Sequence, residues 1–463
     1  MTDALEVVSR LAEVLGDRVD VSFDARRAAR ADKSGHAAAG LPLAVVHAET
    51  VEDVQATLRV AGATRTPVVT RGAGTGLAGA ACAGDGEIAL SLRRMDRILE
   101  VRADDLLAVV EPGILNADLD AALAEHGLWW APDPASRAIS TVGGNIATGA
   151  GGLLCAKYGV VRDAVLGVDV VLADGRLVRL GHRTVKGVTG LDLTSLMIGS
   201  EGTLGVIVGA TLKLRRRVPG EVCTIAATFP RVRAAAAASA AVTASGVQPA
   251  IMELMDAASL AAVHAHLGLD APPAGASQLT IQTDGVAAAD DADAIARILS
   301  ANGGAVAVTA DPAEGEQLLT VRRSMHPAME GLGTTLIEDV SVPRSALPTM
   351  FDEIARIEGE YELVIPTVAH AGDGNLHPNF VFDAVADDAG VVRVPPLVWE
   401  AADALFRAAL DLGGTLTGEH GVGTLKSRWL ADELGDDQWE IQRRITRVFD
   451  PDGVLNPGKV FLR

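Results

Sequence analysis

Short apolar runs separated by turn-forming residues dominate the first half of the chain. The runs are aliphatic and rich in valine, and glycine or proline bounds most of them. Runs of this kind are typical of buried β-strands. They predict strands at 43–48, 66–70, 87–92, 106–113, 166–175 and 205–214. Apolar residues at helical spacing predict helices over 1–20, 51–61 and 116–126.

From residue 218 onward, helical and strand patterns alternate without a dense cluster of glycines. Predicted helices cover 232–245, 289–300, 348–358, 397–412 and 438–449. Predicted strands cover 278–283, a pair within 334–342, 362–369, 377–382 and 414–417. The basic run RRRVPG, which begins at Arg215, has the character of a linker. These patterns predict an α+β fold with two principal domains that meet near Arg217.

The charge balance of the 463-residue chain excludes one class of partner. Its net charge of −20 at pH 7 repels the backbones of nucleic acids and the surfaces of anionic membranes. We therefore expect no nucleic-acid partner. An anionic substrate would need a local cationic site, because the overall field does not attract it.

The N-terminal segment and the cysteines indicate a cytoplasmic protein. Residues 1–20 carry charges throughout, which argues against a signal peptide. The alanine-rich stretch 234–252 contains polar residues and a proline, so we interpret it as a helix leading into a turn and expect no transmembrane segment. Cys82, Cys155 and Cys223 form no CxxC pair, as expected of reduced thiols. The expected location is the cytoplasm, either free or peripheral at the inner face of the membrane.

A glycine-dense loop follows the predicted strand at 66–70. In TRGAGTGLAGA, Gly74, Gly76 and Gly79 match the dinucleotide-binding pattern GxGxxG. That pattern requires a helix directly after it, and the further glycines Gly84 and Gly86 make a stable helix there improbable. A Rossmann fold is therefore disfavoured, and a glycine turn without a ligand is the simplest alternative.

Two further glycine-rich loops change the balance. STVGGNIATGAGGLL occupies 140–154 and GSEGTLGVI occupies 199–207. Glycine allows backbone N–H groups to approach a pyrophosphate closely and to point at it. Three such loops in one domain indicate a long cofactor that lies along the backbone. Polar contacts are expected from Ser140, Thr141, Asn145 and Thr203.

These loops belong to a longer string that resembles a known family. APDPASRAISTVGGNIATGAGG, KYGVVRDAVLGVDVVLADG and VKGVTGLDLTSLMIGSEGTLGVI follow one another in order. They resemble the FAD-binding domain of the vanillyl-alcohol-oxidase-type flavoproteins, in the branch of D-lactate dehydrogenases, the glycolate oxidase FAD subunit and D-2-hydroxyglutarate dehydrogenases. The resemblance runs from about residue 40 to the C-terminus. It implies a PCMH-type FAD-binding domain (1–217), an α+β substrate-binding cap with a metal site (218–430), and a C-terminal segment (431–463) that returns to the FAD domain.

The same resemblance implies which residues bind FAD. Pyrophosphate contacts are implied for Arg71, Gly72, Gly74, Thr75, Gly76 and Leu77. Contacts to the isoalloxazine ring and ribityl chain are implied for Pro134, Ser136, Thr141, Gly144 and Asn145. Contacts to the adenine side are implied for Gly202 and Val206. Asn456, in the C-terminal segment, completes the predicted set. Loops 71–80 and 140–152 contain no histidine or cysteine, so we expect non-covalent FAD.

Two short motifs between residues 366 and 423 carry candidate metal ligands. PTVAHAGDGNLHPNF holds His370 and His377 on either side of a GDGN turn, which brings two imidazoles to neighbouring strand ends. GTLTGEHGVG adds Glu419 and His420. Two histidines and one carboxylate with open positions suit Zn²⁺, Mn²⁺ or Fe²⁺. The resemblance assigns His370, His377 and Glu419 as the metal ligands and His420 as the catalytic base.

An arginine is a suitable partner for the carboxylate of an acid substrate. VRRSMHPAMEG offers Arg322 and Arg323, and the resemblance favours Arg322 as a catalytic-site residue. The chain departs from the 2-hydroxyglutarate enzymes at His326, where they have a small hydroxyl residue, and at Ile337, where they have a lysine. These departures favour lactate, glycolate or a hydrophobic 2-hydroxy acid over a dicarboxylate.

The sequence therefore predicts a flavoprotein oxidoreductase that uses FAD and a divalent metal to oxidise a D-2-hydroxy acid to the 2-keto acid. A quinone, a cytochrome or an electron-transferring flavoprotein is the expected electron acceptor, and a homodimer is an expected assembly. Three alternatives are a metal-dependent hydrolase, a non-catalytic FAD-binding subunit of an electron-transfer complex, and an ether-lipid synthase or aromatic alcohol oxidase of the same fold. An ether-lipid synthase or an aromatic alcohol oxidase would not need the histidine-containing motifs.

Overall fold

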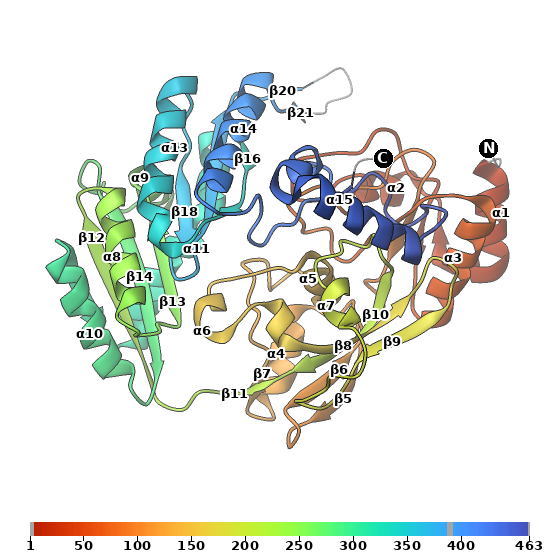
Figure 1. Cartoon of the computed structure of the whole chain (residues 1–463), viewed down its shortest axis with the longest axis horizontal. Helices are drawn as coiled ribbons and strands as arrows, with labels where there is room; N and C mark the ends of the chain where they lie inside the picture. The colour runs from red at the N-terminus through yellow and green to blue at the C-terminus, as the bar shows by residue number, and fades with distance from the viewer. Residues whose placement is uncertain (1–3, 387–391, 462–463) are drawn as a thin grey trace. The chain divides into compact units, whose positions relative to one another are not determined.

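The computed structural model describes residues 4–386 and 392–461 and divides the chain into two compact units. The first unit contains the chain up to Gly151, Gly159–Arg217 and the segment from Glu419 onward. The second contains Gly152–Tyr158 and Val218–Gly418. In Figure 1 the colour of the chain runs from red at the N-terminus to blue at the C-terminus. The chain returns to the first unit at Glu419, earlier than the return at residue 431 that the sequence predicts.

One half of the first unit is a four-stranded sheet covered by helices. Its elements are α1 (Ala4–Leu15), β1 (Val19–Asp20), α2 (Phe23–Ala29), β2 (Ala44–His47), α3 (Val51–Thr64), β3 (Val68–Arg71) and β4 (Ile88–Ser91). The strand order is β1-β2-β4-β3, with β2, β4 and β3 parallel. Val7, Leu11 and Leu15 of α1 pack in the same core as Val54 and Leu58 of α3. Apolar residues at this spacing form one face of a helix, which explains why both segments are helical.

The other half of the first unit is a five-stranded antiparallel sheet. Its strands are β5 (Ile98–Arg102), β6 (Leu107–Val110), β8 (Val165–Val171), β9 (Leu177–Gly181) and β10 (Val206–Lys213). They lie in the order β5-β6-β10-β8-β9. The helices of this half are α4 (Asn116–Ala124), α5 (Val142–Thr148), α7 (Leu193–Met197) and, near the C-terminus, α15 (Leu430–Phe449). A small two-stranded sheet pairs β7 (Leu128–Trp129) with β11 (Arg215–Arg216).

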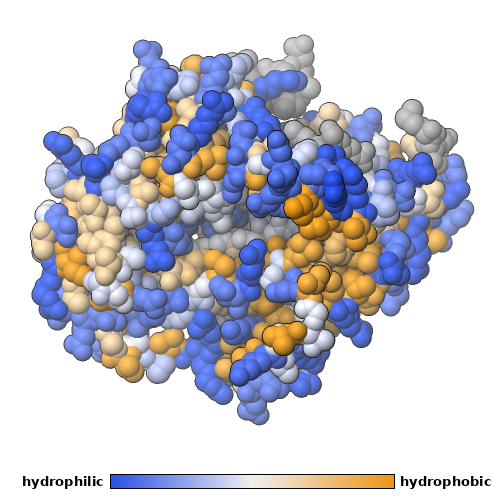
Figure 2. Space-filling view, viewed as in Figure 1, coloured by the Kyte–Doolittle hydropathy of each residue, from blue (hydrophilic) through white to orange (hydrophobic). Residues whose placement is uncertain are grey.

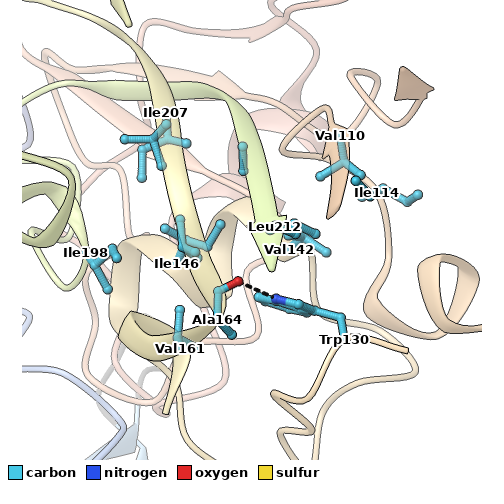
Figure 3. Close-up of a cluster of buried hydrophobic side chains, with 14 of the residues drawn as sticks. Val110, Ile114, Trp130, Val142, Ile146, Val161, Ala164, Ile198, Ile207 and Leu212 are labelled. Carbon is cyan, nitrogen blue, oxygen red and sulfur yellow. Dashed lines mark hydrogen bonds between the residues drawn. The ribbon is translucent and has the colours of Figure 1, made fainter. Parts of the chain in front are cut away.

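The core of this half packs α5 against the sheet. Figure 3 shows Val142 and Ile146 of α5 among Ile207 and Leu212 of β10. In the same cluster the indole Nε1 of Trp130 donates a hydrogen bond of 2.9 Å to the carbonyl oxygen of Ala164. The large ring is therefore buried without leaving its N–H unpaired. The core thus fixes α5, which carries one of the glycine-rich motifs.

The second unit is built on a large antiparallel sheet. Its strands are β12 (Glu221–Phe229), β13 (Ile251–Met255), β14 (Ser277–Gly285), β15 (Ala305–Thr309), β16 (Thr334–Ile337), β17 (Val340–Ser341), β18 (Thr367–His370) and β19 (Asn375–Phe382). The main order is β15-β12-β14-β13-β18-β19-β16, and β17 pairs with β19. Short strands β20 (Val385–Ala386) and β21 (Val392–Arg393) pair with each other.

Helices line this sheet. They are α6 (Cys155–Tyr158), α8 (Val232–Ala244), α9 (Ala257–Leu267), α10 (Ala288–Ala301), α11 (Pro312–Arg323), α12 (Met325–Leu332), α13 (Leu347–Tyr361) and α14 (Pro396–Asp411). Helices α8 and α10 pack on β12 and β14, and α13 packs against α8 and α14 (Figure 1). On α6, Lys157 and Tyr158 both donate hydrogen bonds to Asp284 of β14, which explains why this short segment belongs to the second unit.

The structure departs from the sequence prediction at several places, of which three lie in or near the motifs. The glycine loop at 140–154 contains helix α5, because the side chain of Thr141 caps it by accepting a hydrogen bond from the N–H of Gly144 at 3.2 Å. The predicted strand at 414–417 is wrong, since only an isolated bridge joins Thr415 to Ser341. Strand β18 begins at Thr367 and not at residue 362, because α13 continues to Tyr361.

The polarity of the surface and of the helices bears on whether the chain could cross a membrane. On the face shown in Figure 2, hydrophilic residues cover most of the surface and apolar residues form smaller areas between them. Among the residues that the structure describes, no helix has both the length and the apolar character needed to cross a bilayer. The alanine-rich stretch at 234–252 divides into α8 and the start of β13, which agrees with the interpretation of a helix followed by a turn.

Candidate functional site

Asn456 holds several glycine-rich segments of the first unit together. Its backbone N–H donates to the carbonyl oxygen of Val68 at 2.8 Å. Its side-chain Nδ2 donates to the carbonyl oxygens of Glu201 at 2.6 Å and Ala80 at 3.2 Å. A Cβ atom on Gly202 would lie 3.6 Å from the same Nδ2. The loop after β3, the GSEG motif and the C-terminal segment therefore meet at this residue.

The first and second glycine loops also touch. A Cβ atom on Gly72 would overlap Oγ1 of Thr141, the residue that caps α5. Within the second loop, a Cβ atom on Gly144 would lie 2.9 Å from that oxygen. A larger residue at Gly72 or Gly144 would therefore displace the Thr141 side chain that caps α5.

The side chain of Arg71 serves the protein rather than an open site. Its Nη1 donates to the carbonyl oxygens of Ala29 at 2.6 Å and Ala81 at 3.0 Å, and its Nη2 donates to that of Ala31 at 3.3 Å. The guanidinium thus ties the N-terminal segment to the end of the first glycine loop. The guanidinium of Arg71 is thus already bonded within the protein. The pyrophosphate contact predicted for Arg71 would have to come from its backbone and from the neighbouring N–H groups.

Buried polar atoms without a hydrogen-bond partner gather around these loops. Within residues 4–386 and 392–461, they include Oγ1 of Thr70, Oγ of Ser140, Nδ2 of Asn145 and Oδ1 of Asn456. An unpaired buried polar group costs about 1–3 kcal/mol, so proteins rarely keep one without a function. Asn145 and Asn456 both belong to the predicted FAD-binding set. Four such atoms beside glycine loops fit a large polar cofactor.

The remaining predicted cofactor residues lie on the same segments. Thr75, Gly76 and Leu77 follow β3, and Pro134 and Ser136 form the turn whose carbonyl oxygens accept hydrogen bonds just before α5. Val206 begins β10, and its side chain is fully buried in the core. The side chain of Val206 therefore packs in the core, and only the backbone of this residue could contact a ligand.

Gly76 allows a direct test of cofactor contact. A Cβ atom there would meet nothing closer than Oδ2 of Asp32 at 3.7 Å, so Gly76→Ala should fold normally. If a pyrophosphate packs on this backbone, the added methyl group should weaken FAD binding about tenfold or more, because one charge-assisted contact contributes about 1.5–3 kcal/mol. Flavin absorbance per chain at limiting FAD measures the loss. Gly62→Ala, in helix α3 with similar room, should bind FAD as the parent does, and equal binding by both variants would contradict the contact.

In the second unit, the β18–β19 hairpin brings the two predicted histidines together. His370 ends β18 opposite Asn375, and His377 on β19 lies opposite Val368. The two ring centroids are 5.0 Å apart, the rings are nearly perpendicular, and one nitrogen of each ring lies within 4.8 Å of one of the other. Both residues are buried. This is the arrangement that the GDGN turn predicts.

Glu253 lies behind His370 and was not predicted from the sequence. Its Oε1 accepts a hydrogen bond from Nδ1 of His370 at 2.6 Å, and its Oε2 accepts one from Nε of Arg322 at 2.7 Å. Burial raises the pKa of Glu253, but the nearby charges of His370 and Arg322 outweigh burial and hold the pKa below its usual value. Glu253 is therefore a buried carboxylate that stays ionised.

A second buried carboxylate, Asp339, lies beside His377. Its Oδ1 accepts a hydrogen bond from Nδ2 of Asn375 at 2.6 Å and lies 3.7 Å from Nδ1 of His377. Its Oδ2 accepts one from Oγ1 of Thr417 at 2.5 Å. Each of the two imidazoles thus has a carboxylate next to its Nδ1. Such partners orient metal-binding histidines in proteins.

The structure separates the two candidate arginines. The side chain of Arg322 is 12% exposed and faces Glu253, whereas that of Arg323 is 47% exposed and pairs with Glu316. His326 is also exposed and lies 3.5 Å from Glu330. Of these two arginines, Arg322 is the one that shares a carboxylate with His370.

Glu419 and His420 begin directly where the second unit ends. A Cβ atom on Gly418 would overlap the side-chain amide of Asn375, the first residue of β19. Because consecutive Cα atoms are about 3.8 Å apart, the chain reaches Glu419 within one residue of the histidine hairpin. Oε1 of Glu419 lies 3.8 Å from Nε2 of His420, and both side chains are mostly buried.

Within the first unit, Glu201 holds the loop that follows His420. Its two carboxylate oxygens accept hydrogen bonds from the N–H groups of Val422 at 2.7 Å and Gly423 at 2.8 Å. Burial raises the pKa of Glu201 to about 7, against the effect of these two bonds. Glu201 lies in the GSEG motif, in which the sequence predicts a role for the glycines but not for the glutamate. The motif therefore fixes a second loop in addition to its own turn.

Family models and known proteins match this chain over most of its length. A family model described as FAD linked oxidases, C-terminal domain, matches residues 218–460, and one described as FAD binding domain matches residues 42–181. The glycolate oxidase subunit GlcD of Bacillus subtilis is 37% identical, covering 91% of this chain and 90% of that protein. The D-lactate dehydrogenase of Archaeoglobus fulgidus is 35% identical, covering 90% of each.

A solved structure gives the fold. The structure of p-cresol methylhydroxylase with substrate bound matches with a TM-score of 0.77 at 18% identity, covering 99% of this chain and 97% of that one. At this identity the likeness speaks for the fold alone. It confirms the predicted α+β architecture with a PCMH-type FAD-binding fold.

Proposed function

Because this chain belongs to the family of FAD-linked oxidases, we propose that it is a dehydrogenase that uses FAD and a divalent metal ion to oxidise a D-2-hydroxy acid to the 2-keto acid. D-lactate and glycolate are the favoured substrates, since relatives bear the names D-lactate dehydrogenase and glycolate oxidase subunit. The pair of buried histidines, each beside a buried carboxylate, is the observation that carries the metal part of the proposal.

The first unit is the proposed site of FAD. The unpaired polar atoms of Ser140, Asn145 and Asn456, together with the glycine-rich loops that carry or contact them, fit a dinucleotide cofactor. We propose that the FAD is non-covalent, because loops 71–80 and 140–152 contain no histidine or cysteine. The family match over 42–181 supports FAD in this unit.

His370, His377 and Glu419 are the proposed metal ligands. Two imidazoles and one carboxylate suit Zn²⁺, Mn²⁺ or Fe²⁺ and leave positions open for a substrate. When bound, FAD supplies the two-electron acceptor and the ion polarises the hydroxyl and carboxylate oxygens of the acid. His420, next to Glu419, accepts the hydroxyl proton in its neutral form. The guanidinium of Arg322 binds the substrate carboxylate.

The role of Arg322 predicts a specific kinetic change. Arg322→Ala should raise KM for the acid about 10- to 100-fold, because a charge-assisted hydrogen bond contributes about 1.5–3 kcal/mol. Steady-state rates at saturating metal measure it. Arg323→Ala removes an exposed arginine that pairs with Glu316, and it should keep the parent KM. An unchanged KM in Arg322→Ala would mean that another group binds the carboxylate.

The substrate class can be tested by mixing the yellow protein anaerobically with a panel of D- and L-2-hydroxy acids. The proposal predicts that D-lactate, glycolate or a related D-acid bleaches the flavin while the L-acids do not. A flavin that no 2-hydroxy acid bleaches would instead indicate a non-catalytic FAD-binding subunit. A colourless protein that hydrolyses esters or amides in the presence of metal would indicate the hydrolase alternative. A quinone, a cytochrome and an electron-transferring flavoprotein are the proposed acceptors to test with the reduced protein.

A further inference from the structure

We propose that Glu253 is a positioning residue that couples the metal site to the substrate-carboxylate site, an inference that rests on the proposed function. Its two oxygens are divided between two groups with different roles: Oε1 accepts from His370, and Oε2 accepts from Arg322. One carboxylate thus holds both a proposed metal ligand and the proposed substrate-binding arginine.

The position of Glu253 in the sheet explains why this contact is well defined. Strand β13 lies between β14 and β18, and Glu253 pairs in register with His370. The other residues of β13 are apolar and buried, and Glu253 itself is 1% exposed. A carboxylate buried this deeply costs several kcal/mol unless positive or hydrogen-bonding partners surround it. His370 and Arg322 are those partners, and their places are fixed because the carboxylate needs both.

The contact sets the protonation form of His370. With Nδ1 donating its proton to Glu253, the lone pair of a neutral imidazole lies on Nε2, which is then the nitrogen available to an ion. A carboxylate partner of this kind also raises the basicity of the ligand, and removing it typically lowers metal affinity about 10- to 100-fold. Asp339 is 3.7 Å from Nδ1 of His377, beyond hydrogen-bond distance. Glu253 is therefore the stronger of the two histidine partners.

The same contact sets the plane of the Arg322 guanidinium. Nε is the atom that bonds to Glu253, so the edge formed by Nη1 and Nη2 is the one that can grip a substrate carboxylate. Shortening or neutralising Glu253 frees the arginine to rotate about its side-chain bonds. A change at this one residue should consequently weaken both metal binding and substrate binding, although Glu253 contacts neither ligand.

Zinc titration of the FAD-loaded protein, stripped with a chelator, tests this inference. Glu253→Gln should raise the Kd for Zn²⁺ about 10- to 100-fold and should also raise KM for the acid at saturating Zn²⁺. Glu358→Gln is the matched control: Glu358 is a half-buried glutamate of the same unit, its Oε1 accepts a hydrogen bond from the N–H of Ile365, and its loss should leave both constants unchanged.

Arg322→Ala supplies a second measurement should Glu253→Gln fail to fold. Removing a cation that shares a carboxylate with His370 should lower the Kd for Zn²⁺ several-fold, whereas an arginine that only binds substrate would leave it unchanged. Parental Zn²⁺ affinity in Glu253→Gln, or in Arg322→Ala, would overturn the coupling. A parent protein that binds no Zn²⁺, Mn²⁺ or Fe²⁺ would instead overturn the proposed metal site, so the two failures are distinguishable.

Discussion

Replacing His420 with alanine is expected to leave FAD bound and to slow flavin reduction about 10²- to 10⁴-fold, the range over which a positioned general base accelerates a reaction. His420, the proposed base, is mostly buried and lies next to Glu419, a proposed metal ligand. Anaerobic stopped-flow mixing with D-lactate or glycolate measures the rate directly.

A control separates loss of the base from loss of structure. The control is His126→Ala, since His126 is exposed just after α4 in the same unit. This variant should reduce its flavin at the parent rate. His420→Ala must also retain the parent's FAD content and Zn²⁺ affinity. If it reduced its flavin as fast as the parent, another group would be the base.

Replacing His377 with alanine is expected to remove the metal. Loss of a direct ligand should lower affinity by more than the roughly 10- to 100-fold that loss of a supporting partner causes. FAD content should be unchanged, because the proposed cofactor-binding loops belong to the first unit and His377 belongs to the second. Elemental analysis after dialysis against a weak chelator measures metal per chain.

The matched control is His266→Ala, since His266 lies exposed on α9 of the same unit. It should keep the parent's metal content. Full metal occupancy in His377→Ala would show that His377 is not a ligand, and the hairpin geometry would then need a different explanation.

Much of the fold could be predicted because its signals are local. The apolar runs at 66–70, 87–92 and 205–214 correspond to β3, β4 and β10, and the spacing of Val7, Leu11 and Leu15 corresponds to α1. The resemblance to the flavoprotein family is confirmed by the family models and by relatives that match nearly the whole chain.

Local signals failed where tertiary contacts decide the structure. Gly143 and Gly144 argue against a helix, yet α5 forms because Thr141 caps it and its apolar residues pack in the core. The alanine-rich stretch 234–252 was interpreted as a helix leading into a turn, so strand β13, which begins at Ile251, was not predicted. In both cases packing outweighs the intrinsic preference of the residues.

The candidate site was predicted where a motif carries it and missed where a distant partner does. His370 and His377 follow from the turn between them. Glu253, Asp339 and Glu201 do not, because each acts on a residue far away in the sequence: Glu253 on His370, Asp339 on Asn375, and Glu201 on Val422 and Gly423. A single glutamate within the apolar run IMELM was the one available hint for Glu253.

In the proposed reaction, a flavin and one metal ion act on the same alcohol. Removing the metal from the FAD-loaded protein, and then mixing it anaerobically with D-lactate or glycolate, tests this claim most directly. We expect the metal-free protein to keep its yellow colour in the presence of the acid, and added Zn²⁺, Mn²⁺ or Fe²⁺ to restore bleaching. Bleaching at the parent rate by a protein shown to contain no metal would contradict it.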